Sequence, residues 1–258
     1  MCIRDRREAQ KLLERNAQDG DRLLGAFNRP MPHWLDFFCY TMFVDRDGKF
    51  QLGMLSTSAF KPLAASMGPM LKEESFHLGT GSNGLRRIIK AGVVPLDMLQ
   101  RYINKWVSTA HDLFGVDESS SAHWAYVWGI KGRWDERKKL DADIEVSKET
   151  LNEEARQHYH DEIVREVKKL CGYLPDGNID LYVPHENFHR EIGPFKRQRY
   201  TVEGTLFEGS DEAWNTYVAN HLPTAQDEED LKEIFKQQWV AEKPLTARQI
   251  ASGIGASA

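Results

Sequence analysis

The sequence has few cysteines, no long apolar run and no excess of positive charge, and each absence excludes a class of protein. Its three cysteines, Cys2, Cys39 and Cys171, are far apart and odd in number, so they predict neither a disulfide framework nor a cysteine metal site. We therefore expect a reducing, cytoplasmic location. No apolar run reaches the roughly 18 residues of a membrane span, so no membrane association is expected. The formal net charge of −5 argues against nucleic acid as a partner.

The length and composition fit a globular protein. With 258 residues, the chain can form one large domain or two small ones with a sizeable core. Hydrophobic residues make up 41% of it and charged residues 28%. Residues 1–6 have no helical period and lead directly into what reads as the middle of a helix. We expect them to be an artefact of sequence assembly, with the natural protein starting upstream; the alternative is a short native arm.

Helical periodicity predicts a mainly α protein with a small β-containing appendage towards its C-terminal end. Apolar spacing and helix-start residues predict helices in these segments: 5–17, 33–52, 59–81, 95–114, 147–171, 210–221 and 227–240. Strands are predicted at 179–183 and 199–202. We accordingly expect a partial helical bundle domain over residues 7–172, an appendage over 173–243 and a flexible tail over 244–258.

One segment places a carboxylate and an imidazole on the same helix face. Glu74 and His77 are three residues apart, which on a helix is about one turn. Helical bundles use this spacing to bind one metal of a carboxylate-bridged di-iron site. Asp45, on the preceding predicted helix, is a further candidate ligand, because an unpaired carboxylate is costly to bury on an apolar face. The alternatives are an exposed pair worth about 0.2–0.5 kcal/mol and a turn at Asp45–Gly48.

Proline and glycine are expected to shape the helix that carries Glu74. Pro69 removes a ladder hydrogen bond, so a kink is predicted just before the two adjacent glutamates. Gly79, Gly81 and Gly84 are predicted to end the helix. Because imidazole and carboxylates occur here without a thiolate, the site suits iron or manganese in oxygen chemistry.

The residues around these candidates carry a resemblance to a known family. The run Lys72-Glu-Glu-Ser-Phe-His77, followed by Gly81, resembles the second Glu-x-x-His helix of the ring-epoxidising acyl-CoA monooxygenases, which include the phenylacetyl-CoA enzymes. Two further runs are more similar to the catalytic subunits of the benzoyl-CoA 2,3-epoxidases: Asp45-Arg-Asp-Gly-Lys-Phe-Gln-Leu52 and Gly129-Ile-Lys-Gly-Arg-Trp-Asp135. The resemblance covers about residues 7–235.

The resemblance implies a ferritin-like fold and a di-iron centre that reduces O2 and inserts one oxygen atom into the ring of an aromatic acyl-CoA. Asp45, Glu74 and His77 match three iron ligands of the family; Glu73 matches none and reads as an acid behind the ligands or at the surface. The family's other ligands precede these, and nothing before residue 33 supplies them. We therefore expect a C-terminal fragment that holds half of the ligands, binds iron weakly and is inactive by itself.

Basic residues offer weaker candidates for substrate binding. Lys131 and Arg133 are predicted to meet the phosphates of coenzyme A, beside an aromatic segment, residues 123–134, that could line an acyl pocket. The alternative is aromatic core packing with basic residues at its edge. A second basic set offers the same chemistry: Arg86, Arg87 and Lys90.

The remaining histidines read as structural. Glu186 and His189 repeat the Glu-x-x-His spacing, but Pro184 favours a loop or short helix with solvated charges. Two histidines are expected at the surface of a charged helix and two near the core, respectively His158 with His160 and His111 with His123. The acidic run Asp227–Asp230 is expected to cap a helix.

The leading hypothesis is an O2-dependent di-iron epoxidase of aromatic acyl-CoA thioesters, with benzoyl-CoA as the substrate. Its electrons are expected from a separate reductase, because neither a Gly-rich dinucleotide loop nor an iron–sulfur cysteine set occurs here. One alternative is a non-catalytic ferritin-like scaffold subunit without a working metal site. Another is ferritin-like metal storage, which residues 115–240 disfavour because storage proteins are compact bundles.

Overall fold

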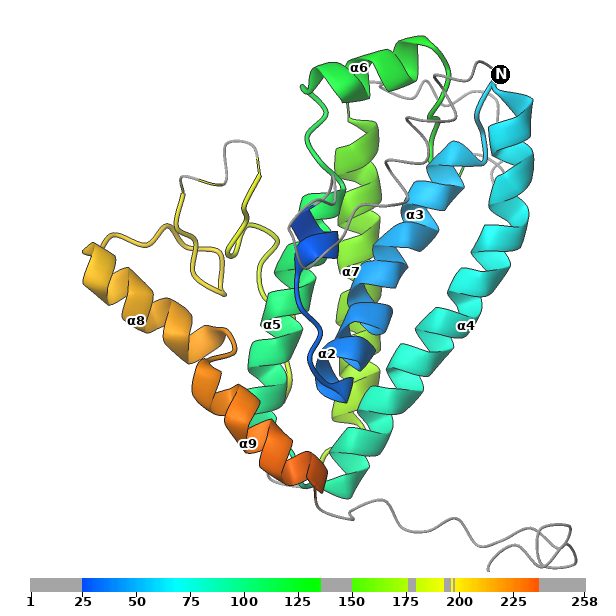
Figure 1. Cartoon of the computed structure of the whole chain (residues 1–258). Helices are drawn as coiled ribbons and strands as arrows, with labels where there is room; N and C mark the ends of the chain where they lie inside the picture. The colour runs from blue at the N-terminus through cyan, green and yellow to red at the C-terminus, as the bar shows by residue number, and fades with distance from the viewer. Residues whose placement is uncertain (1–24, 136–149, 176–179, 193–195, 197, 237–258) are drawn as a thin grey trace, which may run out of the picture.

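The computed structural model describes the following residues: 25–135, 150–175, 180–192, 196 and 198–236. Most of its helices run side by side as one bundle (Figure 1). After a short 3-10 turn, η1 (Gly25–Asn28), the bundle consists of α2 (Trp34–Cys39), α3 (Asp45–Leu55), α4 (Lys61–Ala91), α5 (Leu96–Leu113) and α7 (Leu151–Cys171). A shorter helix, α6 (Ser120–Val127), lies across one end of the bundle (Figure 1). The predicted mainly helical bundle is confirmed, and it is consistent with a ferritin-like fold.

The core forms where α5 and α7 meet the preceding helices. Apolar residues of α5 recur at helical spacing, and Leu99, Ile103 and Trp106 have 0% exposure. Tyr159 of α7 is also fully buried, and its hydroxyl donates to the backbone carbonyl of Phe43, 3.1 Å away. Burial of each such side chain stabilises the fold by roughly 1.5–3 kcal/mol, so this apolar stripe holds α5 inside the bundle.

The predicted helix at 33–52 is present and contains a π turn. His33 caps its start, because Nδ1 of His33 accepts from the N–H of Asp36 at 3.3 Å. After α2 the backbone forms a π-helix, η2 (Tyr40–Val44), and α3 follows directly. The residues Asp45–Gly48 are therefore helical, as predicted, and do not form a turn.

Helix α4 is longer than predicted, because its glycines lie inside it. A Cβ on Gly81 would lie 2.5 Å from the backbone nitrogen of Met42, and one on Gly84 would overlap the ring of Phe38. These glycines therefore allow α4 to approach α2 and η2 closely. The helix ends instead at Gly92, whose φ of 67° is a left-handed conformation that favours glycine. The prediction that the glycine cluster stops the helix is wrong.

The segment between α7 and α8 contains no strand among the residues that can be described. An isolated antiparallel bridge joins Tyr200 to Leu206. At Tyr182 a side chain takes the place of a neighbouring strand: Oε1 of Gln100 accepts from the Tyr182 N–H, and Nε2 of Gln100 donates to the Tyr182 carbonyl, both at 2.9 Å. The prediction of two paired strands is therefore wrong for this part of the chain. Gln100 of α5 makes the backbone hydrogen bonds that a partner strand would otherwise make.

Two helices follow, as predicted: α8 (Asp211–His221) and α9 (Ala225–Lys236). Helix α9 is fastened to α5 by Arg101, whose guanidinium lies 2.5 Å from Oδ1 of Asp227. Oδ2 of Asp227 also accepts from the N–H of Thr224, at 2.8 Å. The acidic run therefore caps the start of α9, as predicted.

Some expectations fall outside the described ranges. The predicted helix at 5–17 and the tail at 244–258 both lie there. The division of the chain at residue 172 stays a prediction. Within the described part of the chain, no helix combines the length and apolarity needed to cross a membrane.

Candidate metal centre

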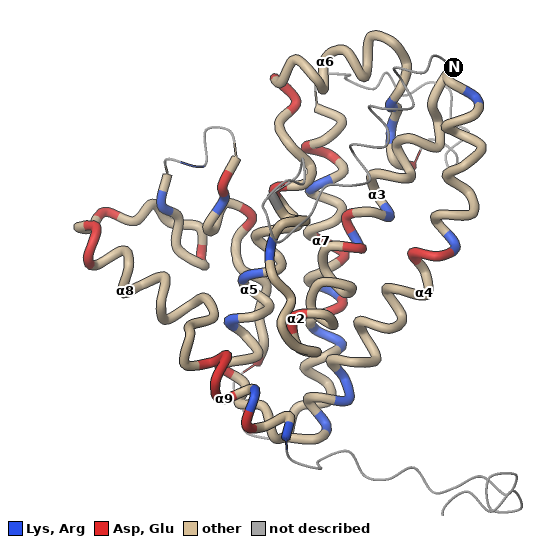
Figure 2. The backbone as a smooth tube through the Cα atoms, in the orientation of Figure 1, with Lys and Arg blue, Asp and Glu red and all other residues tan. Residues whose placement is uncertain are grey.

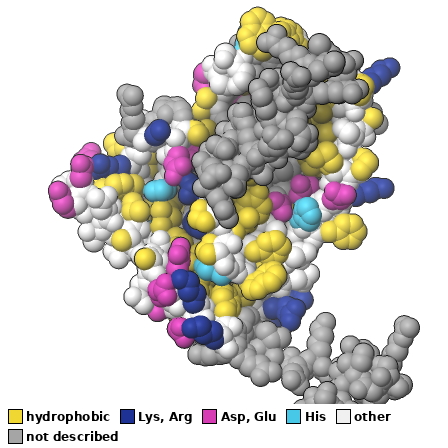
Figure 3. All heavy atoms as spheres, in the orientation of Figure 1, with side chains coloured by type: hydrophobic (Ala, Val, Ile, Leu, Met, Phe, Trp, Pro, Cys, Tyr) yellow, Lys and Arg dark blue, Asp and Glu magenta, His cyan; other side chains and the backbone are white. Residues whose placement is uncertain are grey.

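The three candidate ligands predicted from the sequence converge between α3 and α4. Asp45 is the first residue of α3, and Glu74 and His77 lie one turn apart on α4. Nδ1 of His77 lies 3.6 Å from Oδ2 of Asp45 and 3.7 Å from Oε2 of Glu74. One ligand atom from each residue lies within 4.8 Å of the other two. Figure 2 shows acidic positions at the same level of α3 and α4, and Figure 3 shows a histidine beside acidic side chains on this face.

The two carboxylates are largely removed from water. The side chains of Asp45 and Glu74 are 16% and 20% exposed, whereas that of His77 is 54% exposed. Burial, and then the negative charge of Glu74, raise the pKa of Asp45 to about 7, although His77 acts in the opposite direction. Burial likewise raises the pKa of Glu74. Ionising both acids is therefore unfavourable unless a cation lies between them.

An unused carboxylate oxygen tests whether a metal ion fits. Oε2 of Glu74 is buried and has no hydrogen-bond partner among the residues that the structure describes. Native proteins rarely leave such an oxygen without a partner, so its lone pairs suit a metal ion. Two carboxylates and one imidazole match iron or manganese. The set fits one ion, because a carboxylate-bridged pair needs further ligands.

A glycine lets α3 approach α4 at the ligands. A Cβ on Gly48, one turn after Asp45, would lie 3.2 Å from Oε1 of Glu74. Any larger side chain at this position would press on the Glu74 carboxylate. Glu73 is exposed, in agreement with the surface interpretation. Pro69 lies inside α4 before Glu74, and the kink expected there stays a prediction.

A cavity of about 430 Å³ opens beside the two carboxylates. Its lining combines apolar and acidic side chains: Phe27, Tyr40, Val44, Asp45, Asp47, Gly48, Gln51, Glu74 and Leu113. Asp47 is only 3% exposed, and burial raises its pKa to about 8. Sequence reasoning missed Tyr40, Asp47 and Gln51. Asp47 could have been found as a second acid beside Asp45, whereas helical periodicity does not reveal the π turn that places Tyr40 here.

Comparisons with known proteins identify the family of this chain. A family model described as "Phenylacetic acid catabolic protein" matches residues 4–209. The chain belongs to this family. It is 35% identical to benzoyl-CoA oxygenase component B of Aromatoleum evansii, over 86% of its own length and 56% of that protein. It is 27% identical to one subunit of the 1,2-phenylacetyl-CoA epoxidase of Escherichia coli (strain K12), over 67% of its own length and 51% of that protein. The chain thus spans about half the length of the curated relatives it matches.

The two basic residues predicted as coenzyme A ligands, Lys131 and Arg133, both contact other side chains of the chain. Nζ of Lys131 donates to Oε1 of Gln51 at 2.9 Å and to Oδ1 of Asn152 at 3.1 Å. Burial lowers the pKa of Lys131. Arg133 pairs with Asp135. Lys131 therefore supports the cavity wall from behind, and a phosphate-binding role for the two residues stays a prediction.

The aromatic segment 123–134 divides between core and surface. Trp134 packs against Phe50 with 4.9 Å between the ring centroids. Trp124 and Trp128 are 49% and 67% exposed. No residue of this segment belongs to the lining of the cavity described beside the carboxylates. Core packing thus accounts for Trp134, whereas Trp124 and Trp128 pack against each other at the surface, with 5.5 Å between their ring centroids.

The residues of the second basic set, Arg86, Arg87 and Lys90, lie in two different places. Arg86 and Lys90 lie over the ring of Tyr173, at 5.8 Å and 4.9 Å from its centroid. Arg87 lines a separate cavity of about 620 Å³. A shared phosphate site for the set stays a prediction.

Two of the other histidines lie as predicted and two do not. His158 is exposed and His111 is fully buried, as predicted. His123 is exposed instead of near the core, because its face of α6 points to solvent. His160 is half-buried instead of at the surface, with Nδ1 3.3 Å from Nε2 of His111. Burial lowers the pKa of both members of this pair, which therefore stays neutral inside the fold.

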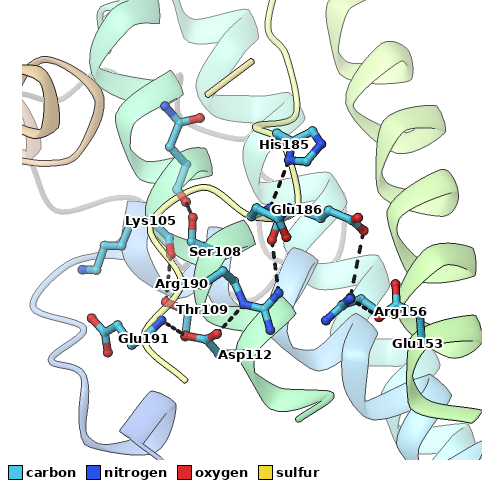
Figure 4. Close-up of polar contacts among 12 residues, drawn as sticks. Lys105, Ser108, Thr109, Asp112, Glu153, Arg156, His185, Glu186, Arg190 and Glu191 are labelled. Carbon is cyan, nitrogen blue, oxygen red and sulfur yellow. Dashed lines mark hydrogen bonds and ion pairs between the residues drawn. The ribbon is translucent and has the colours of Figure 1, made fainter. Parts of the chain in front are cut away.

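The second Glu-x-x-His motif lies in a turn, as predicted, but the Glu186 side chain is only 23% exposed, so the prediction that its charge is solvated is wrong. His189 has a φ of 48°, so the motif does not follow helical spacing. Oε2 of Glu186 lies 4.0 Å from Nε of Arg156 on α7, and Arg190 pairs with Asp112 on α5 (Figure 4). These contacts fasten the segment to the bundle, which gives the motif a structural explanation.

Proposed function

We propose that this chain forms one half of the oxygen-activating di-iron centre of an epoxidase that acts on the ring of an aromatic acyl-CoA, with benzoyl-CoA as the substrate. The observation that carries the proposal is the convergence of Asp45, Glu74 and His77 beside a cavity of about 430 Å³. One relative is named a benzoyl-CoA oxygenase component and another a phenylacetyl-CoA epoxidase subunit, which supports the substrate class.

The chain's own contribution to this chemistry is positioning. Asp45, Glu74 and His77 would hold one ferrous ion through two carboxylates and an imidazole. Iron bound there would pass electrons from a reductase to O2, so that one oxygen atom enters the ring and the other leaves as water. The packing of α3 against α4 at Gly48 holds the ligand atoms. The apolar part of the cavity excludes water and keeps the ring next to the carboxylates.

The second iron and the electrons come from outside this ligand set. Three ligands are too few for a carboxylate-bridged pair, so another Glu-x-x-His motif and further carboxylates must complete it. By itself the chain therefore binds iron weakly and does not turn over. Both relatives are named as parts of larger oxygenase systems, which supports a separate reductase as the electron donor.

Anaerobic titration with ferrous iron tests the metal assignment. The chain is expected to take up one iron, weakly, and His77→Ala is expected to abolish that uptake. His123→Ala is the matched control, because His123 is an exposed histidine on α6. Unchanged uptake in His77→Ala, or two tightly bound irons in the chain by itself, would contradict the assignment.

Turnover tests the reaction. The chain is joined to the part of benzoyl-CoA oxygenase component B that the alignment leaves uncovered, and is supplied with a reductase, O2 and benzoyl-CoA. Oxygen consumption with formation of a ring epoxide is expected. A joined protein that folds and holds no iron would point to a non-catalytic scaffold. Oxidation of iron without conversion of the acyl-CoA would point to metal storage.

A further inference from the structure

A tyrosine stands in the wall of the cavity beside the carboxylates. Tyr40 is the first residue of η2, and its backbone carbonyl accepts from the N–H of Asp45. In an α-helix, residues five apart point about 140° away from each other around the axis. An i+5 hydrogen bond widens the turn and brings them towards the same side. The π turn therefore places Tyr40 and Asp45 in one wall of the cavity.

The core holds the ring of this tyrosine in place. Tyr40 meets Trp106 edge to face, with ring centroids 5.3 Å apart and planes at 85°. Trp106 is 0% exposed, and its indole N–H donates to Oδ1 of Asp36 at 2.8 Å. Because Trp106 is itself buried and hydrogen-bonded, it gives the Tyr40 ring a fixed surface to pack against.

The Tyr40 hydroxyl offers the cavity a hydrogen-bond donor that is not already in use. The other polar groups of the wall include the carboxyl groups of Asp45, Asp47 and Glu74, of which Asp45 and Glu74 are ionised and only accept once they bind a metal ion. The amide nitrogen of Gln51 already donates to Oδ1 of Asp47 at 3.2 Å and to the carbonyl of Leu113 at 3.4 Å. The Tyr40 hydroxyl makes no hydrogen bond to any residue that the structure describes.

This tyrosine keeps its proton at neutral pH. The pKa of a tyrosine hydroxyl is ordinarily about 10. A neutral phenol is a donor for a carbonyl oxygen, which the surrounding carboxylates would otherwise repel.

We propose that the Tyr40 hydroxyl donates a hydrogen bond to the thioester carbonyl of an aromatic acyl-CoA whose ring lies in the cavity; this inference rests on the function proposed above. In benzoyl-CoA the carbonyl is conjugated with the ring, so holding the carbonyl also orients the ring. The ring edge then faces Asp45 and Glu74, and Val44 and Leu113 cover it. A cavity of about 430 Å³ lies within the usual range of small-molecule sites and takes the acyl group, with the coenzyme A nucleotide outside.

Binding to the iron-free chain tests this contact without turnover. Isothermal titration compares benzoyl-CoA with S-benzyl-CoA, in which a methylene group replaces the carbonyl. Tyr40→Phe is expected to weaken benzoyl-CoA binding roughly three- to tenfold, the effect of one net hydrogen bond, and to leave S-benzyl-CoA binding unchanged. Tyr173→Phe is the matched control, because Tyr173 packs against Arg86 and Lys90 and does not line the cavity described here.

The carbonyl stretch of bound, 13C-labelled benzoyl-CoA gives a second measurement, which reports on the hydrogen bond directly. A hydrogen bond to the carbonyl lowers this infrared frequency relative to the free thioester, and Tyr40→Phe is expected to restore it. Thermal melting by circular dichroism checks that Tyr40→Phe keeps the fold.

The outcomes separate the contact from the proposed function. An unshifted carbonyl frequency in the bound state overturns the contact and leaves the proposed function standing. Equal weakening of both ligands by Tyr40→Phe, or no weakening of benzoyl-CoA, has the same consequence. If the unchanged chain binds benzoyl-CoA no more tightly than free coenzyme A, the aromatic group does not enter the cavity, and both the contact and the proposed function are overturned.

Discussion

The imidazole of His77 on α4 lies 3.6 Å from the carboxylate of Asp45 at the start of α3. The candidate ligand set therefore belongs to the interface of two helices and not to one helical motif. Any change that separates α3 from α4 is expected to weaken metal binding before it unfolds the bundle.

Gly48→Ala tests this dependence on helix approach. The added methyl group would lie 3.2 Å from Oε1 of Glu74 and displace that carboxylate, so ferrous iron should bind roughly tenfold more weakly. Gly79→Ala is the matched control, because nothing lies within 4 Å of its Cβ. The control should bind iron normally and gain about 0.5–1 kcal/mol of stability. An equal loss of iron in both variants would show a general effect on the helices.

The buried acid of the candidate centre makes metal-free protein less stable as pH rises. The pKa of Asp45 is raised from 3.8 to about 7, so the folded state binds more protons than the unfolded state between these values. Its contribution is fully present below about pH 4 and is lost as pH rises through about 7. Asp45→Asn should reduce this loss by roughly 2 kcal/mol, allowing for solvent screening.

Urea denaturation of both proteins across this pH range measures the difference. The free energy of unfolding should depend differently on pH in the two proteins, because the other titrating groups are common to both. Added divalent metal should restore stability at neutral pH in the unchanged chain but not in Asp45→Asn. A steeper decline in Asp45→Asn would contradict the raised pKa.

Gln100→Leu is expected to release the backbone at Tyr182 from α5. The substitution removes two hydrogen bonds of 2.9 Å and should lower the free energy of unfolding by about 1–3 kcal/mol. The Tyr182 amide should also exchange faster with deuterium. Gln226→Leu is the control, since that amide donates to Asp230 on the exposed surface of α9. Unchanged exchange at Tyr182 would show that other contacts hold this segment.

Arg190→Met should be the most destabilising of these substitutions. The Arg190 side chain is 0% exposed and pairs with Asp112, itself 12% exposed, so its removal leaves a buried carboxylate with reduced compensation. A loss of about 3–5 kcal/mol is expected from urea denaturation. Arg199→Met is the control, because its partner Asp211 is 80% exposed. That variant should lose less than about 1 kcal/mol, and similar losses in both would argue against anchoring by the buried pair.

The sequence predicted a residue of the candidate site more easily when the residues it contacts are close to it in the sequence. Glu74 and His77 are neighbours through one helical turn, so their spacing alone indicates a pair. Asp45 reaches them only because α3 packs on α4. Tyr40 joins the same wall through a π turn that apolar periodicity does not reveal, since the signal averages over whole helices.

The errors in the fold have the same origin. Gly81 and Gly84 have the composition of a helix end, but Met42 and Phe38 pack against them inside one. The residues around Tyr182 have the pattern of a strand, but Gln100 occupies the place of a strand partner. In both cases a residue distant in the sequence decides between two local structures of similar propensity.

By itself, the sequence determined the helices of the bundle, because a 3.6-residue apolar period is a property of neighbouring residues and selects one buried face, as in α5. It also determined the pairing of Glu74 with His77. The sequence also named Asp45 as a candidate ligand, but only the tertiary structure brought it next to Glu74 and His77 and placed Tyr40 in the wall of the cavity beside them. These arrangements depend on the distance and angle between packed helices, which side chains from several elements set together.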